Sequence, residues 1–518
     1  MEETSNREVN LEIKVIDDGQ EPSKSKSESE SESETIIKVE ELFTPRIPRV
    51  PPMMRNHENN KGMFDPKLVS IGPYHHGKED LQLVENIKPM VATLFLQDSG
   101  KNMDEVYSMI LEKVDDARSY YVKRSIAEYN RKQFAKMMLL DGCFILAIIE
   151  DFLSFYSSHA CRESKYDDVK NHLGTFLWFS TVQDIFYLVE NQLPFQVLEL
   201  LMSLKFKEDD HDEGMKSIHK LLNFLISQDT RHIENKEKVD VNETDRESFH
   251  LLQLARTKYL NLNKSVHVLE SQMGTKKEKD KFQCKQCLKD YIRYLFCFLK
   301  KVKFWCMRLK MLRFVKKLKS SKPEYNLMED VHPFRSVTEL KAKGIYLTPN
   351  SSLSLEAIEF KSFCFYGRLE LHPFMITRVT KLFYSNMLAY EMVSSSMCEE
   401  DPVITDYINF MRSLIDNQDD VKELRSKHIL FNNLGSDQEV VNVFKELITF
   451  GSSFGEYSHA KEGIQNHYNS TAKTWMAELI NKYFSGPWTA IAFVAAACLF
   501  VLAFLQTYYT ISPHSSHK

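Results

Sequence analysis

An uncharged apolar stretch near the C-terminal end constrains this chain more than any other feature. It runs from Trp488 to Tyr509, WTAIAFVAAACLFVLAFLQTYY, and contains no Asp, Glu, Lys or Arg. As a helix it would be about 33 Å long, which matches a hydrocarbon core of about 30 Å. The stretch therefore predicts one transmembrane helix over 488–509, followed by a short C-terminal tail, 510–518.

Aromatic residues at both ends of this stretch support the prediction, because Trp and Tyr favour the membrane–water interface. The predicted anchor residues are Trp488, Phe493, Leu499, Phe500, Leu502, Phe504, Tyr508 and Tyr509. Lys473 and Lys482 precede the stretch and only Lys518 follows it, which favours a cytosolic bulk. We therefore expect a single-pass membrane protein, in the plasma membrane or an endomembrane. Sugar on the sequons at Asn242, Asn350 and Asn469 would indicate the reverse orientation.

Composition favours helices over a turn-rich sheet fold. Apolar residues make up 43% of the chain, whereas Gly and Pro number only 16 each. Nine scattered cysteines fit reduced thiols better than a disulfide scaffold, and the first 40 residues show no signal-peptide core. We predict a mainly α fold: a large multi-helix domain with a small β-hairpin element and one C-terminal transmembrane helix.

Charge divides the chain into segments. Residues 1–42 form an acidic, Ser-rich tail with the run SKSKSESESESE, which is expected to be disordered because it has nothing to bury. Residues 43–484 are expected to form the mainly helical domain. Within it, residues 275–322 hold 17 Lys or Arg against three acids and are interpreted as a basic amphipathic insertion.

Local patterns place individual elements inside the domain. The stretch 129–153 is apolar on nearly every face and predicts a central core helix. Thr181-Val-Gln-Asp184 predicts a helix-capping box, and Pro194 predicts a break between two helical pieces. Alternation over Phe360–Ile376 predicts a hairpin, and 421–432 has a helical pattern. Capping boxes are also predicted at Ser336 and Ser436.

The basic insertion suggests two binding partners. Its cations suit anionic lipid, and its large apolar residues are spaced like the anchors of basic calmodulin-binding helices. The candidate residues are Trp305, Leu309, Phe314, Leu318, Lys300, Lys301, Lys303, Lys316 and Lys317. The alternative is a solvated positive face whose apolar side packs on the domain. Nucleic acid is not expected as a partner of a membrane-anchored chain.

Six segments, in order, resemble a plant family, the domain-of-unknown-function family 247. They are SIGPYHHG at Ser70–Gly77, MMLLDGCFIL at Met137–Leu146, DIFYLVENQLPFQVLELL at Asp184–Leu201, SVTELKAKGI at Ser336–Ile345, SNMLAYE at Ser385–Glu391 and the apolar stretch near the end. The resemblance covers about 43–510. It implies a largely helical plant protein with a C-terminal anchor, no established enzymatic activity, and relatives associated with self-incompatibility recognition in grasses. It supplies no catalytic residues.

Several constellations invite a chemical interpretation. His75 and His76 are adjacent, so in an extended segment they point to opposite faces, and a turn held by His hydrogen bonds is favoured over a metal site. Asp184 with Glu190, or Glu150 with Asp151, offers paired carboxylates without a recognisable pocket. Capping and a polar turn at Glu190-Asn191-Gln192 explain the first pair.

The cysteines of the basic insertion superficially suggest zinc. Cys284 and Cys287 form a C-x-x-C pair, but Cys297 and Cys306 are nine residues apart within a helical pattern, which places them on opposite sides of a helix. Reduced or reversibly acylated cysteines are favoured. The chain also has no phosphate-binding loop, G-x-S-x-G or H-E-x-x-H motif.

Together these observations predict a membrane-anchored plant protein that binds partners in recognition or signalling, is not an enzyme and needs no cofactor or metal. The expected partners are membrane lipid, through the C-terminal helix, and a protein such as calmodulin. One alternative is a membrane-associated enzyme of an unrecognised class, with a site near His75, His76 or Glu190. Another is an extracellular-facing recognition protein of the self-incompatibility type.

Overall fold

The computed structural model describes residues 45–157, 163–205, 211–227, 248–261, 335–350, 355, 358–363, 366–396, 401–450, 455–470 and 487–511. The predicted tail 1–42 and the basic insertion 275–322 lie outside these ranges. The described residues are mainly helical, with a few short strands, as expected from composition. Contacts between residues divide the chain into two units, Met1–Pro45 and Arg46–Lys518, and the second unit contains all the helices and strands described below.

The N-terminal half of this unit is helical. Its α-helices are α2 (Pro52–Arg55), α3 (Gln82–Leu96), α4 (Met103–Glu112), α5 (Val114–Arg118), α6 (Arg131–Ser157), α7 (Asp167–Leu173), α8 (Thr175–Tyr187), α9 (Phe195–Lys205), α10 (His211–Ser227) and α13 (Leu251–Asn261). Short 3₁₀ turns lie at Glu58–Asn60, Glu79–Leu81, Gln97–Ser99 and Lys123–Ile126.

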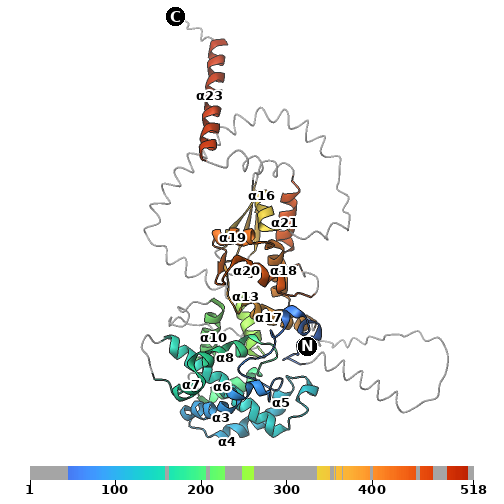
Figure 1. Cartoon of the computed structure of the whole chain (residues 1–518), viewed down its shortest axis with the longest axis vertical. Helices are drawn as coiled ribbons and strands as arrows, with labels where there is room; N and C mark the ends of the chain where they lie inside the picture. Colours follow the sequence, from blue (N-terminus) through green and yellow to red (C-terminus); the bar gives the residue numbers. More distant parts are fainter. Residues whose placement is uncertain are drawn as a thin grey trace, which may run out of the picture. The chain divides into compact units, whose positions relative to one another are not determined.

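Helix α6 is the centre of this half, as its all-round apolar pattern predicts. It packs against α3, α4, α5, α8, α9 and α10 (Figure 1). Phe134, Met138, Cys143 and Phe144 on α6 are all fully buried. A helix that is apolar on every face is stable in water only when other elements cover all of its faces, and α6 meets this condition.

The C-terminal half combines helices with two small sheets. Its helices are α16 (Val337–Ala342), α17 (Thr380–Ser396), α18 (Val403–Leu414), α19 (Gln418–Ser426), α20 (Asp437–Glu446), α21 (Ser458–Tyr468) and α23 (Pro487–Ile511). Its strands are β1 (Ile345–Pro349), β2 (Glu359–Ser362), β3 (Gly367–Leu371), β4 (Phe374–Ile376) and β5 (Leu430–Asn432). One buried hydrophobic cluster extends through both halves, and α17 packs on α8 between them.

The predicted hairpin is present. Strands β2 and β3 pair antiparallel, with Glu359 opposite Glu370 and Ser362 opposite Gly367. The β structure is larger than predicted, because β1 joins β3 in parallel and β4 pairs in parallel with β5. The predicted helix over 421–432 is therefore wrong at its end: α19 stops at Ser426, and the chain continues as β5.

The local capping predictions had different outcomes. Ser336 and Ser436 are the N-caps of α16 and α20, and each side chain accepts a hydrogen bond from the backbone three residues on. Thr181 does not cap a helix, because α8 already begins at Thr175. The break at Pro194 is confirmed, since α8 ends at Tyr187 and α9 begins at Phe195.

The predicted transmembrane helix over 488–509 is not supported. The chain forms α23 there, and side chains such as Phe500 and Phe504 are exposed on it. In the part of the chain that the structure describes, no helix combines the length and hydropathy needed to cross a bilayer.

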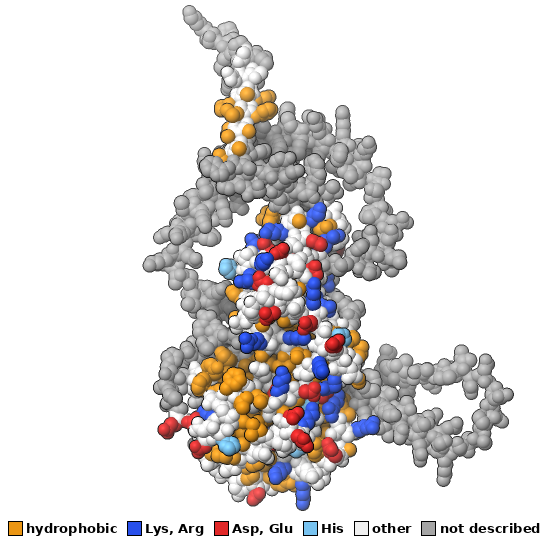
Figure 2. Space-filling model, in the orientation of Figure 1, with side chains coloured by type: hydrophobic (Ala, Val, Ile, Leu, Met, Phe, Trp, Pro, Cys, Tyr) orange, Lys and Arg blue, Asp and Glu red, His pale blue; other side chains and the backbone are white. Residues whose placement is uncertain are grey.

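The described surface carries both signs of charge. Figure 2 shows acidic and basic side chains interspersed, with hydrophobic side chains gathered in one area and along α23. Large exposed apolar residues away from α23 include Phe155, Phe176, Met375 and Phe431. Two of these, Met375 and Phe431, face each other across the β4–β5 pair.

Candidate functional site

The turn that carries SIGPYHHG is held by a carboxylate from α8. The backbone amides of Lys67, Leu68 and Val69 donate to Asp184 Oδ2 at 3.0, 2.7 and 3.1 Å. Burial raises the pKa of Asp184, and the three amide hydrogen bonds oppose that rise. Asp184 therefore binds a segment more than 100 residues earlier in the chain, whereas its sequence context had suggested a helix cap.

The side-chain amides of Asn191 and Gln192, shortly before Pro194, also form hydrogen bonds to main-chain groups. Asn191 accepts from the backbone of Ile71 at 2.7 Å and donates to the carbonyls of Val69 and Asp184. Gln192 donates to two carbonyls at the end of α8 and accepts from Leu252 at 2.9 Å. Both amides are buried, and their hydrogen bonds are made to main-chain groups. The segment 184–192 thus fixes the turn at 67–72.

A buried ion pair supports the same turn from the core. Lys88 Nζ lies 2.6 Å from Asp141 Oδ1, donates to the carbonyl of Ser70 at 2.6 Å and also pairs with Glu85. Asp141 Oδ2 accepts from the amide of Gly72 at 2.8 Å. Burial raises the pKa of Asp141, and the Lys88 ammonium opposes the rise. Sequence reasoning placed Asp141 in the core but missed Lys88, whose partner is 53 residues away.

Glu190 binds the N-terminal arm, which we define as residues 46–77. Its carboxylate accepts from the amide of Val50 at 2.6 Å and lies 3.2 Å from Arg49 Nη1 and 2.7 Å from Arg55 Nη2. Asp65 holds the other side of Arg55 at 3.2 Å. Glu190 is 1% exposed, so its two arginine partners compensate a charge that has almost no contact with water.

His75 lies between these two carboxylates. Its Nε2 is 3.5 Å from Glu190, its Nδ1 is 3.8 Å from Asp65, and neither nitrogen has a hydrogen bond among the described residues. Burial, with Lys78 and the nearby arginines, lowers the pKa of His75 to about 3. The turn exists, but the prediction that His hydrogen bonds hold it is wrong. Hydrogen bonds from its backbone to Asp141, Asp184 and Asn191 hold it instead.

His76 is separated from this group. It is about one-third exposed, and its Nδ1 lies 3.6 Å from Glu85 Oε2. Its ring also meets Tyr129 edge-on, with the ring centroids 5.8 Å apart. The two adjacent histidines therefore point to different surroundings, as the alternation of an extended segment predicts.

The other predicted carboxylate pair also diverges. Glu150 contacts the Tyr166 hydroxyl at 3.0 Å and Lys205 at 2.6 Å. Asp151 accepts from Trp178 Nε1 at 2.9 Å. Asp184 and Glu190 likewise bind different parts of the N-terminal segment. Over the described ranges, no group of three or more His, Cys, Asp or Glu side chains is arranged to hold a metal ion.

The segment SNMLAYE performs a similar linking role in α17. Asn386 accepts from the amide of Val189 at 3.0 Å and donates to the carbonyl of Met63 at 2.7 Å. Glu391 accepts from Arg256 Nη2 at 2.8 Å and from the backbone amides of Ile404 and Thr405. Four of the six segments that resemble the family are therefore connected through buried polar side chains. We call Asp141, Asp184, Glu190, Asn191, Gln192, Asn386 and Glu391 the polar clamp.

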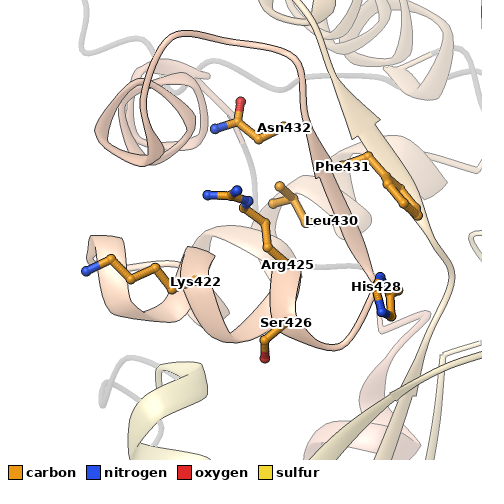
Figure 3. A pocket seen from close by; sticks show the side chains of 7 residues that line it. All are labelled: Lys422, Arg425, Ser426, His428, Leu430, Phe431 and Asn432. Carbon is orange, nitrogen blue, oxygen red and sulfur yellow. The ribbon is translucent and has the colours of Figure 1, made fainter.

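An open pocket lies apart from the polar clamp. It has a volume of about 560 Å³ and is lined by Lys422, Arg425, Ser426, His428, Leu430, Phe431 and Asn432, from the end of α19 and β5 (Figure 3). Sequence reasoning missed it because the helical pattern over 421–432 hid the turn at His428. The proposed lipid or calmodulin anchors, Trp305, Leu309, Phe314 and Leu318, lie outside the described residues.

Comparison with known proteins gives the family. The profile of a family described as plant proteins of unknown function, domain of unknown function 247, matches residues 47–502. The chain is 25% identical over 470 residues to "UPF0481 protein At3g47200" of Arabidopsis thaliana, covering 89% of this chain and 85% of that protein. It is 24% identical over 495 residues to "Putative UPF0481 protein At3g02645" of the same plant, covering 86% of each. No solved structure matches significantly. The chain therefore belongs to the domain-of-unknown-function 247 family of plant proteins.

Proposed function

We propose that this protein is a binding component in recognition or signalling and performs no catalysis of its own. The observation that carries the proposal is the polar clamp. Asp184 and Glu190, the carboxylates that most resembled a catalytic pair, bind backbone amides and cations of the same chain.

The chemistry of His75 supports this choice over the enzyme alternative. A general base works best when its pKa lies near the operating pH and when it reaches the proton that it removes. The pKa of His75 is about 3, and its side chain is 2% exposed. Glu190, the nearest carboxylate, already contacts Arg49, Arg55 and the amide of Val50.

Turnover and folding can be separated with three variants of the full chain. His75→Gln, Glu190→Gln and the exposed control His172→Gln on α7 are incubated with a plant metabolite extract, and small molecules are followed by mass spectrometry beside thermal melting. We expect an unchanged metabolite profile with every protein, a lower Tm for Glu190→Gln and an unchanged Tm for His172→Gln. Conversion of any metabolite by the wild-type protein that a folded His75→Gln or Glu190→Gln variant fails to perform would overturn the proposal.

A further inference from the structure

The second sheet ends in an open strand edge beside the pocket. Strand β5 pairs only with β4 among the described strands. Hydrogen bonds from Phe374 to Ile429 and from Asn433 to Ile376 direct the odd-numbered residues of β5 toward β4. Because backbone groups alternate along a strand, those of Leu430 and Asn432 point to the other side, where a further strand can pair.

Apolar anchors lie next to this edge. Phe431 is 46% exposed and Met375, its neighbour across the sheet, is 43% exposed. Figure 3 shows Phe431 on one side of β5 and Leu430 and Asn432 on the other, with Arg425 of α19 facing them. A peptide strand added here would place alternate side chains beside Phe431 and beside α19.

The α19 side of the edge presents cations with unused donors. Arg425 Nη1 contacts both oxygens of Asp437 at 2.8 and 3.0 Å, and Asp437 also accepts from Asn432. A guanidinium has five N–H donors, so this contact orients Arg425 and leaves further donors for a second carboxylate.

Lys422 is the more easily recruited cation. It pairs with Asp419 at 2.9 Å, and both side chains are largely exposed. Such exposed pairs contribute little stability, so Lys422 can exchange Asp419 for a ligand carboxylate at small cost. Glu423 is bound to Lys341 at 2.6 Å, and Lys427 is 4.0 Å from it, but none of these three side chains lines the pocket. The lining contains the cations Lys422 and Arg425 and no Asp or Glu, which favours an acidic ligand.

His428 lines the pocket from the turn that ends α19. Helix α19 ends in a Schellman motif, with Ile429 donating to the carbonyl of Leu424 and His428 to that of Arg425. The residue at this position takes a left-handed conformation, and His428 has φ +57°. Glycine adopts that conformation without strain, yet here a histidine occupies it and its side chain lines the pocket.

We propose that the open edge of β5 and this pocket bind an extended acidic segment of a partner protein by strand addition. The main chain of the segment pairs with Leu430 and Asn432. Its apolar side chains pack on Phe431 and Met375, and its carboxylates contact Lys422 and Arg425. The pocket volume of about 560 Å³ lies within the range of ligand pockets in proteins, so side chains of the segment can enter it. This inference rests on the proposed binding function and names the surface and the class of partner.

The probe is a fluorescein-labelled, end-capped peptide of ten residues alternating Glu and Val, with an alternating Lys and Val peptide as its charge control. Fluorescence anisotropy on the purified full chain measures both. We expect the Glu–Val peptide to bind and the Lys–Val peptide not to bind. Phe431→Ser and Lys422→Glu should each weaken binding about tenfold, because they remove an anchor and reverse a charge.

Matched surface changes control for non-specific effects. Phe176→Ser removes an aromatic ring that is 82% exposed on α8, and Lys132→Glu reverses an exposed charge on α6. Both should bind the Glu–Val peptide like the wild type. His428→Gly should melt at a higher temperature and yet bind more weakly, a combination that a loss of folding cannot produce.

Three results would overturn the site: no binding of the Glu–Val peptide, equal binding of the Lys–Val peptide, or unchanged binding by both Phe431→Ser and Lys422→Glu. Each of these would refute this surface without refuting a binding function. The binding function itself fails only through the His75- or Glu190-dependent turnover described above.

Discussion

At the scale of single residues, Gly72 shows how tightly the SIGPYHHG turn is fitted. It has φ +71°, and a Cβ there would lie 2.8 Å from the carbonyl oxygen of Gln192 and 2.9 Å from the Tyr121 hydroxyl. Gly77 has φ +81° but nothing within 4 Å of a Cβ. A side chain at Gly77 would therefore meet backbone strain alone, whereas one at Gly72 would meet both strain and steric overlap.

We expect Gly77→Ala to lower the free energy of unfolding by about 1 kcal/mol, the cost of a left-handed alanine. Gly72→Ala should cost about 3 kcal/mol or more, because the backbone of Gln192 must also move. Urea unfolding of both variants measures the difference. Equal losses would show that the turn is not packed against Gln192 as described.

Buried histidines make stability depend on pH. Burial lowers the pKa of His372 to about 4, and its ring lies among Phe374 and Tyr407 with no hydrogen bond in the described part of the chain. Burial likewise lowers the pKa of His75 and His250 to about 3. Below the ordinary pKa of about 6.5, the unfolded chain binds protons that these folded side chains do not, so stability falls as pH falls.

Replacing one such histidine should flatten this dependence. Between pH 7.5 and pH 5, each buried neutral histidine contributes a loss of about 2 kcal/mol. His372→Phe should therefore lose less stability than the wild type over that interval, measured by urea unfolding at both pH values. A His372→Phe variant with the wild-type pH profile would contradict the assignment.

At the scale of elements, the Lys88–Asp141 pair joins α3 to α6 beneath the turn. Removing one partner leaves a buried charge without compensation. We expect Lys88→Met to lower the free energy of unfolding by about 3–5 kcal/mol. The double variant Lys88→Met/Asp141→Leu should lose less than the sum of the single variants, because neither member of this pair is then left buried without the other. Additive losses in this double-mutant cycle, measured by urea unfolding, would mean that the two side chains do not interact.

The same scale shows what the sequence could predict. Helix α6 could be predicted because its apolar residues cover every face. The starts of α16 and α20 could be predicted because Ser336 and Ser436 accept hydrogen bonds from amides only three residues away. Asp184 was misassigned because its partners lie in residues 67–69, a contact that no local pattern contains. Strand β5 was missed because the helical pattern continues through His428, where the left-handed backbone reverses the chain.

At the scale of the whole molecule, the polar clamp connects segments that are far apart in sequence. The pairs Glu190–Val50, Asp184–Leu68 and Asn386–Met63 each join the N-terminal arm to a helix or loop more than 100 residues away. The apolar stretch at the C-terminal end shows that hydropathy alone can mislead. It predicted a membrane span, which the described part of α23 does not support. The polar clamp thus forms a scaffold whose buried carboxylates and amides bind groups of the same chain, and we propose a recognition surface at β5.

Amide hydrogen exchange of Glu190→Gln, followed by mass spectrometry, tests the central claim most directly. If Glu190 holds the N-terminal arm through Val50, Arg49 and Arg55, removing its charge should speed exchange in residues 47–77 and leave the centre of α6 protected. The exposed control His172→Gln on α7 should leave both regions unchanged. Wild-type protection of residues 47–77 in Glu190→Gln would contradict the account, because Glu190 would then be dispensable for the fold.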